Sequence, residues 1–246
     1  MPAGSELFII IECVDSTNNN AMGQIHSGKA KDGNTWFAME QTEGRGRRGK
    51  IWEASRGQNI VLSIVADTHF LQVYQQFQLS VAVSLSCYDF YKVYDNINTK
   101  IKWPNDLFWN DRKAGGILIE NVINGNIWQW GVIGIGININ QTDFSVEKYQ
   151  PVSLKQITGQ TYNIIECGRR LYRCVIKRLT ELKSNGFDNM LTEYNSILYK
   201  RHEKVKLKKK NVIFETTLTG VSHLGQLQTV DSIERNFDFD EIEWIL

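Results

Sequence analysis

The sequence contains little proline, few cysteines and almost no net charge. Only 3 of its 246 residues are proline, and its 4 cysteines form no CxxC pair. The 4 histidines show no HExxH spacing. Neither disulfide bonds nor a structural zinc site is therefore indicated, and buried free thiols are expected. The 28 basic and 27 acidic residues leave a net charge of +1, so no overall field favours nucleic acid or a membrane surface.

Long apolar runs are missing as well. No segment approaches the roughly 18 consecutive apolar residues of a membrane span, and the first residues lack the basic and then apolar pattern of a signal peptide. The composition, 42% hydrophobic and 22% charged, allows a full core and a second small module. We therefore expect a cytoplasmic globular enzyme.

The apolar pattern predicts mixed α/β order followed by a small β-rich tail. Strands are expected at residues 8–13, 35–41, 59–66, 117–122 and 128–139, the last two joined by an Asn-Gly-Asn turn at 124–126. Helices are expected at about residues 15–26, 71–94, 164–182 and 187–199. After Arg201 the period changes to 2, and short strands at 205–208, 212–219 and 225–230 suffice for a small barrel.

The densest motif lies at residues 41–52, which read QTEGRGRRGKIW. Closely spaced glycines let backbone N–H groups approach an anion, while Arg45, Arg47 and Arg48 offer bidentate donors to phosphate or carboxylate oxygens. Trp52 closes the motif as an aromatic lid. Because these cations repel one another without an anion, we expect the loop to be disordered until a ligand binds.

Two other interpretations of this motif are weaker. Gly44-x-Gly46-x-x-Gly49 matches a dinucleotide fingerprint, with Asp67 at a suitable distance. Such a turn must open a helix, whereas residues 50–58 lack a helical apolar period and precede a strand. A nucleic-acid patch usually extends into further basic sequence, but strand-like segments flank this loop.

Two more motifs bring a carboxylate and a lysine into one region. Residues 102–106 read KWPND, where the proline stiffens a turn and presents Asn105 and Asp106. Residues 111–120 read DRKAGGILIE, in which Lys113 precedes a glycine pair. Taken alone, this region is equally well explained as a surface turn with an ion pair.

The last motif, GIGININ, occupies residues 134–140. Glycines within an apolar strand indicate a bulge or the close approach of another group, and Asn138 is positioned to direct its amide at a ligand. This motif is weak by itself.

Taken in order, these motifs resemble biotin protein ligases, also called biotin–[acetyl-CoA-carboxylase] ligases. The resemblance starts at Ser16-Thr17-Asn18 and Gln41, continues through GRGRRGK, KWPND, RKAGGILIE and GIGINI, and covers nearly the whole chain. It implies an α+β fold, with a mixed β-sheet flanked by helices and a small SH3-like β-barrel after it. The implied domains are a catalytic domain at residues 1–201 and the barrel at residues 202–246.

The resemblance also implies a two-step reaction. Biotin and ATP give biotinyl-5′-AMP and pyrophosphate, and biotin then passes to a specific lysine of the biotin carboxyl carrier domain of biotin-dependent carboxylases. Mg²⁺ is expected to arrive with ATP, and no tightly bound prosthetic group is expected. A lipoate–protein ligase is the alternative enzyme, and a non-catalytic biotin- or nucleotide-binding regulator is the alternative of another class.

By resemblance, the motif residues divide into three roles. The implied biotin-binding residues are Ser16, Thr17, Asn18, Gln41, Gly44, Arg45, Gly46, Arg47, Lys113, Gly116 and Gly134. The implied ATP- or AMP-binding residues are Arg47, Arg48, Lys50, Trp52, Asn105, Asp106 and Asn138. Lys113, Arg47 and Asp106 are the implied catalytic residues, and Asp106 is also a candidate ligand for Mg²⁺. Lys50 ranks below Arg47 because many relatives carry Arg at its position.

Two expectations concern partners. Only fifteen residues precede Ser16, which leaves no room for the DNA-reading domain of larger relatives, so DNA binding is not expected; a homodimer is one expected assembly. Residues 200–210 carry seven basic positions against one acid. This stretch is either an edge strand protected by lysines or a docking surface for an acidic carrier domain.

Overall fold

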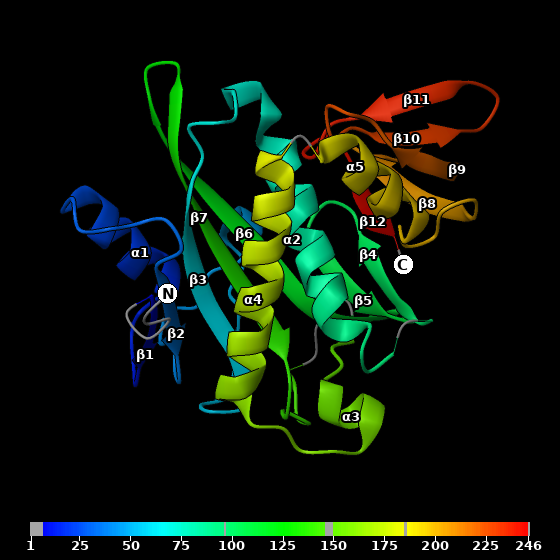
Figure 1. Ribbon diagram of the computed structural model, residues 1–246. Coiled ribbons are helices and arrows are strands. Elements are labelled where there is room, and N and C mark those ends of the chain that lie inside the picture. The colour runs from blue at the N-terminus through cyan, green and yellow to red at the C-terminus, as the bar shows by residue number, and fades with distance from the viewer. Residues whose placement is uncertain (1–6, 96, 146–149, 185, 246) are drawn as a thin grey trace.

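The computed structural model describes residues 7–95, 97–145, 150–184 and 186–245, and its main part is a seven-stranded mixed sheet (Figure 1). The strands follow one another in the order β1-β2-β3-β7-β6-β5-β4. The β1–β2 pair is parallel, and the other neighbours are antiparallel. The strand bounds are Phe8–Ile11 (β1), Thr35–Ala38 (β2), Asn59–Asp67 (β3), Thr99–Lys102 (β4), Asp106–Trp109 (β5), Arg112–Asn124 (β6) and Ile127–Asn138 (β7).

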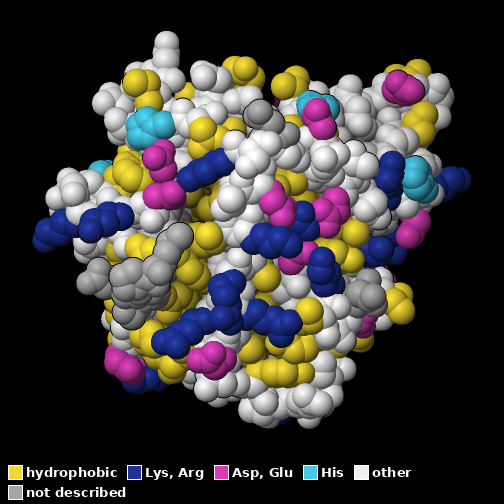
Figure 2. Space-filling view, in the orientation of Figure 1, with side chains coloured by type: hydrophobic (Ala, Val, Ile, Leu, Met, Phe, Trp, Pro, Cys, Tyr) yellow, Lys and Arg dark blue, Asp and Glu magenta, His cyan; other side chains and the backbone are white. Residues whose placement is uncertain are grey.

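Two long helices, α2 (Gln76–Tyr91) and α4 (Ile164–Lys183), lie side by side across one face of the sheet (Figure 1). Helix α2 is buried on most sides because it packs against the sheet, against α4 beside it and against α5. Basic and acidic side chains are interspersed on this face (Figure 2), in agreement with the balanced composition. Among the residues that the structure describes, no helix is long and apolar enough to cross a lipid bilayer.

Helix α1 (Thr17–His26) packs on the opposite face of the sheet. There Ala21 joins Trp36, Val65 and Val132 in a small second core cluster. In the part of the chain that the structure describes, the remaining helices are the short α3 (Leu154–Thr158), α5 (Phe187–Ser196) and two 3₁₀ turns, η1 (Arg47–Gly49) and η2 (Val73–Gln75). The face that carries α1 is also the face on which the loop of the arginine motif lies.

The C-terminal part is a five-stranded antiparallel sheet in the order β11-β10-β9-β8-β12. Its strands are β8 (Lys204–Lys209), β9 (Val212–Val221), β10 (Leu227–Val230), β11 (Glu234–Phe237) and β12 (Glu243–Ile245). The predicted α+β fold is confirmed, and the second sheet is consistent with the predicted SH3-like barrel. Its buried residues join the main core, so the division into domains at residue 201 stays a prediction.

Two predicted helices are shorter in the structure than the apolar pattern suggested. In place of a helix over residues 71–94, η2 precedes α2, because the side chain of Gln75 accepts a hydrogen bond from the backbone N–H of Gln72 at 2.7 Å. Helix α5 ends at Ser196 rather than at residue 199. The backbone after it leaves the helix to bond to both sides of Ile101 in β4.

Several local features were missed or misassigned from sequence. Strands β4 and β5 and helix α3 were not predicted, because short segments with lysines or a single turn leave little periodic signal. One interpretation of the lysine-rich stretch at residues 200–210 was an edge strand, but strand β8 in this stretch lies between β9 and β12. The expectation of buried thiols is wrong for Cys13, which is exposed beyond the end of β1, whereas Cys87 and Cys167 are buried.

Candidate active site

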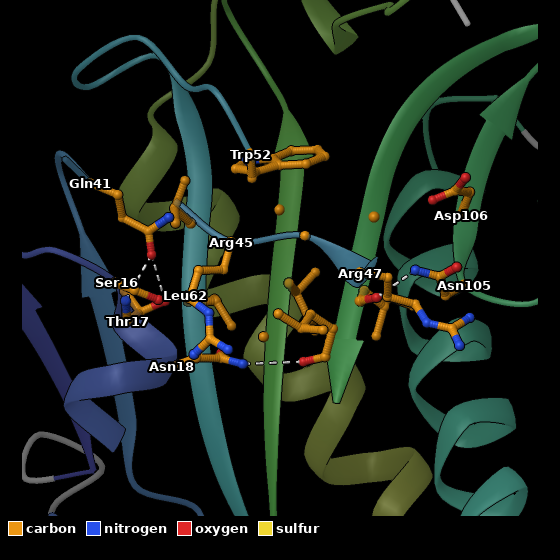
Figure 3. A pocket seen from close by; sticks show the side chains of 18 of the residues that line it. Ser16, Thr17, Asn18, Gln41, Arg45, Arg47, Trp52, Leu62, Asn105 and Asp106 are labelled. Atoms are coloured by element: carbon orange, nitrogen blue, oxygen red, sulfur yellow. Dashed lines mark hydrogen bonds between the residues drawn. The ribbon is translucent and has the colours of Figure 1, made fainter. Parts of the chain in front are cut away.

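A pocket lies on the α1 face of the sheet, under the loop that carries the arginine motif (Figure 3). It gathers the start of α1, the segment after β2, the loop, the β4–β5 turn and strands β3, β6 and β7. Its lining residues are Ser16, Thr17, Asn18, Gln41, Arg45, Gly46, Arg47, Trp52, Val61, Leu62, Asn105, Asp106, Lys113, Gly116, Ile117, Leu118, Gly134, Ile135 and Gly136. The structure therefore brings together most of the residues that the motifs indicated.

Uncharged polar side chains form one end of the pocket. Ser16 is the N-cap residue of α1. Thr17 donates two hydrogen bonds to Gln41 Oε1, from its backbone N–H at 2.7 Å and from its hydroxyl at 3.0 Å. Ser16 and Thr17 are almost fully buried. These contacts fix a neutral, hydrogen-bonding slot whose groups are held in place before any ligand enters.

Two residues that sequence reasoning missed complete this end. Ser63 Oγ of β3 lies 2.7 Å from Thr17 Oγ1 and 2.5 Å from Asn18 Oδ1. Glu120 of β6 accepts a hydrogen bond from Asn18 Nδ2 at 2.7 Å and pairs with Arg45 at 2.9 Å. Both could have been found from the sequence, because Ser63 is the only hydroxyl residue in an apolar strand and Glu120 is the last residue of the RKAGGILIE motif. The ion pair compensates the charge of Arg45 and keeps this end close to neutral.

Two glycines of β7 let side chains lie directly on the sheet. A Cβ atom at Gly134 would lie 2.4 Å from Asn18 Oδ1, and one at Gly136 would lie 2.3 Å from the Trp52 ring. The close approach predicted for these glycines is confirmed. Figure 3 shows Trp52 covering the pocket from the side opposite Asn18. With the indole in this position the cavity measures about 60 Å³, which is smaller than typical small-molecule sites.

A cationic end faces the β4–β5 turn. Lys113 of β6 places its Nζ 2.9 Å from Asp106 Oδ1 and 5.7 Å from the centroid of the Trp52 ring. The turn is tied to β6 because Asn105 Nδ2 donates to the carbonyl oxygen of Ile117 at 2.7 Å. The predicted turn is thus present, and it sets a carboxylate and an ammonium group next to each other in the pocket wall.

Two successive arginines of the loop point to different places. Arg47 lines the pocket beside Asn105 (Figure 3), and burial lowers the pKa of its guanidinium. Arg48 has a left-handed backbone with a φ of 57°. Its Nε and Nη2 atoms lie 3.0 and 2.7 Å from Oδ1 of Asp240 in the C-terminal part. The hydrogen bond from Arg48 lowers the pKa of the Asp240 carboxyl.

Gly44, Arg48 and Lys50 do not line the pocket. Gly44 lies against the backbone of Trp52, whose N–H donates to its carbonyl oxygen at 2.9 Å, and Lys50 is exposed. Gly46 donates to the carbonyl oxygen of Lys50 at 2.7 Å. The loop therefore has an internally hydrogen-bonded form, and its ordering by a ligand stays a prediction.

Asn138 is also outside the pocket, although its amide was expected to face a ligand. The residue is 4% exposed, and its Nδ2 lies 3.4 Å from the carbonyl oxygens of Lys113 and Val152. In this position the amide joins the end of β7 to β6 and to the segment before α3. The resemblance implies that Asn138 contacts the nucleotide, whereas in this structure its amide contacts backbone carbonyl oxygens outside the pocket.

A neutral polar slot continuous with a cationic wall is typical of an enzyme that holds an organic acid beside phosphate groups. The comparisons with known proteins agree with this class. The model of the biotin/lipoate A/B protein ligase family matches residues 10–138, which is more than half of the chain. The chain belongs to this family.

Relatives and solved structures give the same result. The bifunctional ligase/repressor BirA of Bacillus spizizenii is 26% identical over 237 residues, covering 94% of this chain and 73% of its own length. The biotin–[acetyl-CoA-carboxylase] ligase of Mycobacterium tuberculosis is 30% identical over 141 residues, covering 56% and 51%.

The structure of the biotin protein ligase from Aquifex aeolicus in complex with biotin and ATP has the same fold. Its TM-score is 0.82 at 24% identity, and the match covers 97% of this chain and 98% of that chain. The resemblance drawn from the motifs is confirmed: this chain is a ligase enzyme of the biotin protein ligase type.

Proposed function

We propose that this chain is an ATP-dependent biotin–protein ligase that forms biotinyl-5′-AMP, releases pyrophosphate and transfers biotin to a lysine of a biotin carboxyl carrier domain. One observation carries the proposal: a single pocket joins a neutral polar end, at Thr17 and Gln41, to a cationic end, at Arg47 and Lys113. Biotin has the same order of groups, an uncharged ring urea at one end and a carboxylate at the other.

The neutral end suits the urea of biotin. A urea offers one carbonyl acceptor and two N–H donors, and the hydroxyls of Ser16 and Thr17 with the amides of Asn18 and Gln41 supply both kinds of partner. Gly116 and Gly134 form the floor, and Arg45 and Gly46 form the wall beside it. Recognition here is by hydrogen bonds in a buried slot.

The cationic end suits the carboxylate and the α-phosphate, which repel each other unless positive charge lies between them. Arg47 and Lys113 supply this charge, Trp52 covers the adenine, and Asn105 and Asp106 contact the nucleotide. Three further residues that the resemblance assigns to nucleotide binding lie outside the pocket: Arg48, Lys50 and Asn138. They can contact the nucleotide only after the loop or the end of β7 rearranges. The small size of the cavity supports such a movement.

Mg²⁺ enters this scheme with ATP rather than through a protein cage. Within the described residues, no group of three or more His, Cys, Asp or Glu side chains is placed to hold a metal. Asp106 fits as a single carboxylate ligand, in competition with Lys113. When bound, Mg²⁺ would neutralise phosphate charge.

In the second step the amine of the acceptor lysine attacks the acyl carbon of biotinyl-5′-AMP. The C–N bond forms, the bond to the phosphate oxygen breaks, AMP leaves, and Asp106 is placed to accept the proton of the amine. The carrier domain as partner, a cytoplasmic location and a homodimer belong to this proposal.

The direct test is ATP–pyrophosphate exchange with each candidate acid. We expect exchange that depends on biotin and not on lipoate, because the neutral end matches a urea rather than a dithiolane ring. Lipoate-dependent exchange would identify a lipoate–protein ligase. Biotin binding without any exchange would identify a regulator.

Replacing Arg47 by Gly should weaken retention of the intermediate more than its formation. The change removes one phosphate clamp and adds backbone freedom that costs roughly 0.5–1 kcal/mol to order. We expect faster release of biotinyl-5′-AMP and biotin on proteins other than the carrier. Quench-flow separation of bound and free intermediate measures this, and tight retention by the variant would contradict the clamp.

Arg56→Gly is a matched control, because Arg56 is an exposed arginine outside the pocket that pairs with Glu12 and Glu40. Limited proteolysis checks the accompanying prediction on the loop. Residues 45–50 should be cleaved in the free enzyme and protected when biotin and ATP are both present. Equal cleavage in the two states would exclude ordering by the ligand.

The basic strand β8 is the candidate docking surface for the carrier. Lys208 and Lys209 lie opposite Ile213 and Val212 of β9, which are 58% and 65% exposed. Reversing both charges with Glu should slow biotin transfer to an acidic carrier at low salt and leave formation of biotinyl-5′-AMP unchanged.

The transfer rate at several salt concentrations measures this effect. Lys29→Glu with Lys31→Glu reverses two exposed charges near α1, at a distance from β8 in sequence and sheet. If the two double variants slow biotin transfer equally, or if the variant of Lys208 and Lys209 does not slow it, β8 is not the docking surface.

A further inference from the structure

The segment between β11 and β12 reaches from the C-terminal sheet to the catalytic pocket. Phe239 in this segment stacks on Trp103 of the KWPND motif, with ring centroids 5.4 Å apart and an angle of 29° between the planes. It also contacts Phe77 of α2 at 6.1 Å. The guanidinium carbon of Arg47 lies 5.4 Å from the centroid of the same ring.

Trp103 gives this contact a rigid base. It is 1% exposed, and its indole N–H donates to the carbonyl oxygen of Gly225 at 2.9 Å. The indole is therefore held between the catalytic sheet and the C-terminal part. Because the ring of Phe239 stacks on a fixed indole, its own position is fixed as well.

A second contact ties the same segment to the loop. Arg48 donates to Asp240 Oδ1 and, from Nη2, to the carbonyl oxygen of Phe239 at 2.9 Å. Two successive loop residues thus meet two successive residues of the C-terminal segment. This pairing sets the position of the loop backbone next to Phe239.

The guanidinium of Arg47 needs such support. Arginine has a long side chain with many rotamers, and a clamp on phosphate works only when the group is already in place. The side chain is partly buried and lies beside a cavity of about 170 Å³ that Phe239 also lines. Among the described residues, Arg47 forms no ion pair with a carboxylate. An aromatic face attracts a desolvated guanidinium and orients its plane.

We propose that Phe239 is a positioning residue for Arg47, so that the C-terminal part supplies a group on which adenylation depends. This inference rests on the proposed function, in which Arg47 clamps biotin carboxylate and phosphate. The ring touches neither substrate. It holds the guanidinium at the edge of the pocket through a cation–π contact, and the ring is itself held in place by stacking on Trp103.

The test compares biotin-dependent ATP–pyrophosphate exchange in Phe239→Leu, Phe239→Tyr, Arg47→Ala and the double variant Phe239→Leu with Arg47→Ala. Leucine fills most of the space but lacks the aromatic face, so kcat should fall about tenfold, with a smaller change in the KM for biotin. Tyrosine keeps the face and should retain most of the activity. In the double variant the loss should equal that of Arg47→Ala alone, because the ring acts only through the arginine.

Phe214→Leu is the matched control. Phe214 is a partly buried aromatic residue of β9 that contacts Phe237 of β11, with ring centroids 5.8 Å apart. It should leave kcat within twofold of the wild type, and thermal unfolding of each variant shows whether it is folded.

The outcomes separate the two proposals. Losses that multiply in the double variant, or a Phe239→Tyr variant as slow as Phe239→Leu, would show that Phe239 only packs the interface and would overturn the positioning role, with the proposed function intact. Absence of biotin-dependent exchange in the wild type would instead overturn the proposed function and this inference with it.

Discussion

Replacing Lys113 by Ala should lower the rate of biotin-dependent ATP–pyrophosphate exchange by roughly 10²–10³, the loss typical for one preorganised donor. The ammonium group is held beside Asp106 at 2.9 Å and faces the ring of Trp52 at 5.7 Å. Its interaction strengthens as charge develops on the phosphoryl oxygens, so the transition state loses more than the ground state. The affinity for biotin should change far less.

Steady-state exchange and biotin binding by calorimetry measure the two quantities separately. Lys100→Ala is the matched control, since Lys100 lies in β4 of the same sheet and outside the pocket. Near-normal exchange in Lys113→Ala would show that Lys113 has only a structural role, as the ion-pair partner of Asp106. Equal losses in binding and in rate would instead assign Lys113 to recognition of biotin.

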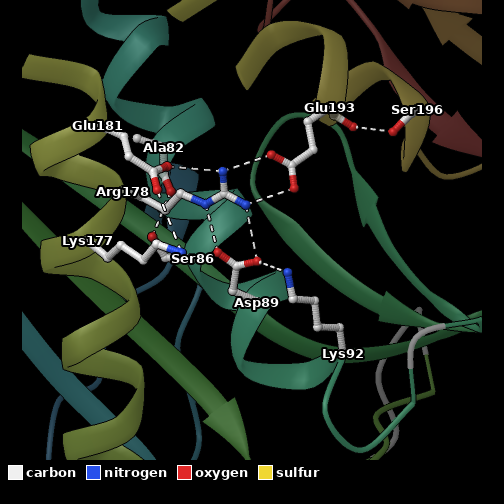
Figure 4. Close-up of polar contacts among 9 residues, drawn as sticks. All are labelled: Ala82, Ser86, Asp89, Lys92, Lys177, Arg178, Glu181, Glu193 and Ser196. Atoms are coloured by element: carbon white, nitrogen blue, oxygen red, sulfur yellow. Dashed lines mark hydrogen bonds and ion pairs between the residues drawn. The ribbon is translucent and has the colours of Figure 1, made fainter. Parts of the chain in front are cut away.

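The second large effect concerns stability. Arg178 of α4 lies at the junction of α2, α4 and α5, where it bonds to Asp89 and Glu193 at distances down to 2.7 Å (Figure 4). Arg178 and Asp89 have side chains only 11% and 10% exposed. Arg178→Met should lower the free energy of unfolding by about 3 kcal/mol, because it leaves the buried carboxylate of Asp89 with only the partly exposed Lys92 as a cation.

The stabilisation by Arg178 should depend on pH, because it requires Asp89 to be ionised. Burial alone would raise the pKa of Asp89, but hydrogen bonds from Arg178 and Lys92 lower it below the usual 3.8. The stabilisation by Arg178 is therefore complete above that value and is lost as the pH falls through the folded-state pKa. The difference between wild type and Arg178→Met should be largest near neutral pH and should shrink below about pH 4.

Urea unfolding at several pH values measures this difference. Lys177→Met is the control, because Lys177 is exposed and pairs only weakly with Glu181 at 3.8 Å. It should change the free energy of unfolding by less than about 0.5 kcal/mol. A constant difference between wild type and Arg178→Met across this pH range would show that lost packing, rather than lost charge, is responsible.

Local sequence patterns predicted much of the fold. Helix α4 follows from apolar residues at a period of 3.6, and the β6–β7 hairpin follows from the Asn-Gly-Asn turn. The KWPND turn was also predicted, because proline restricts its own φ and the residue before it. In each case the chemistry of a few neighbouring residues determines the backbone, so no distant contact is needed.

The pocket was predicted only in part. Five motifs in order named Ser16, Gln41, Arg47 and Lys113 as neighbours, and the structure places them in one pocket. Glycines were informative because a Cβ at their positions excludes another group, as Asn18 over Gly134 shows. Their sequence positions indicated close approach without indicating which side chain approaches.

The sequence by itself determined the family, the order of the catalytic motifs and most elements of the sheet, since these depend on residue type and local spacing. Only the tertiary structure decided that Asn138 joins strands, that Arg48 faces Asp240, that Ser63 and Glu120 complete the neutral end, and that Phe239 supports Arg47. These contacts join residues up to 192 positions apart. Such pairs are set by sheet order and by the packing of the C-terminal part on the catalytic part, which no local pattern encodes.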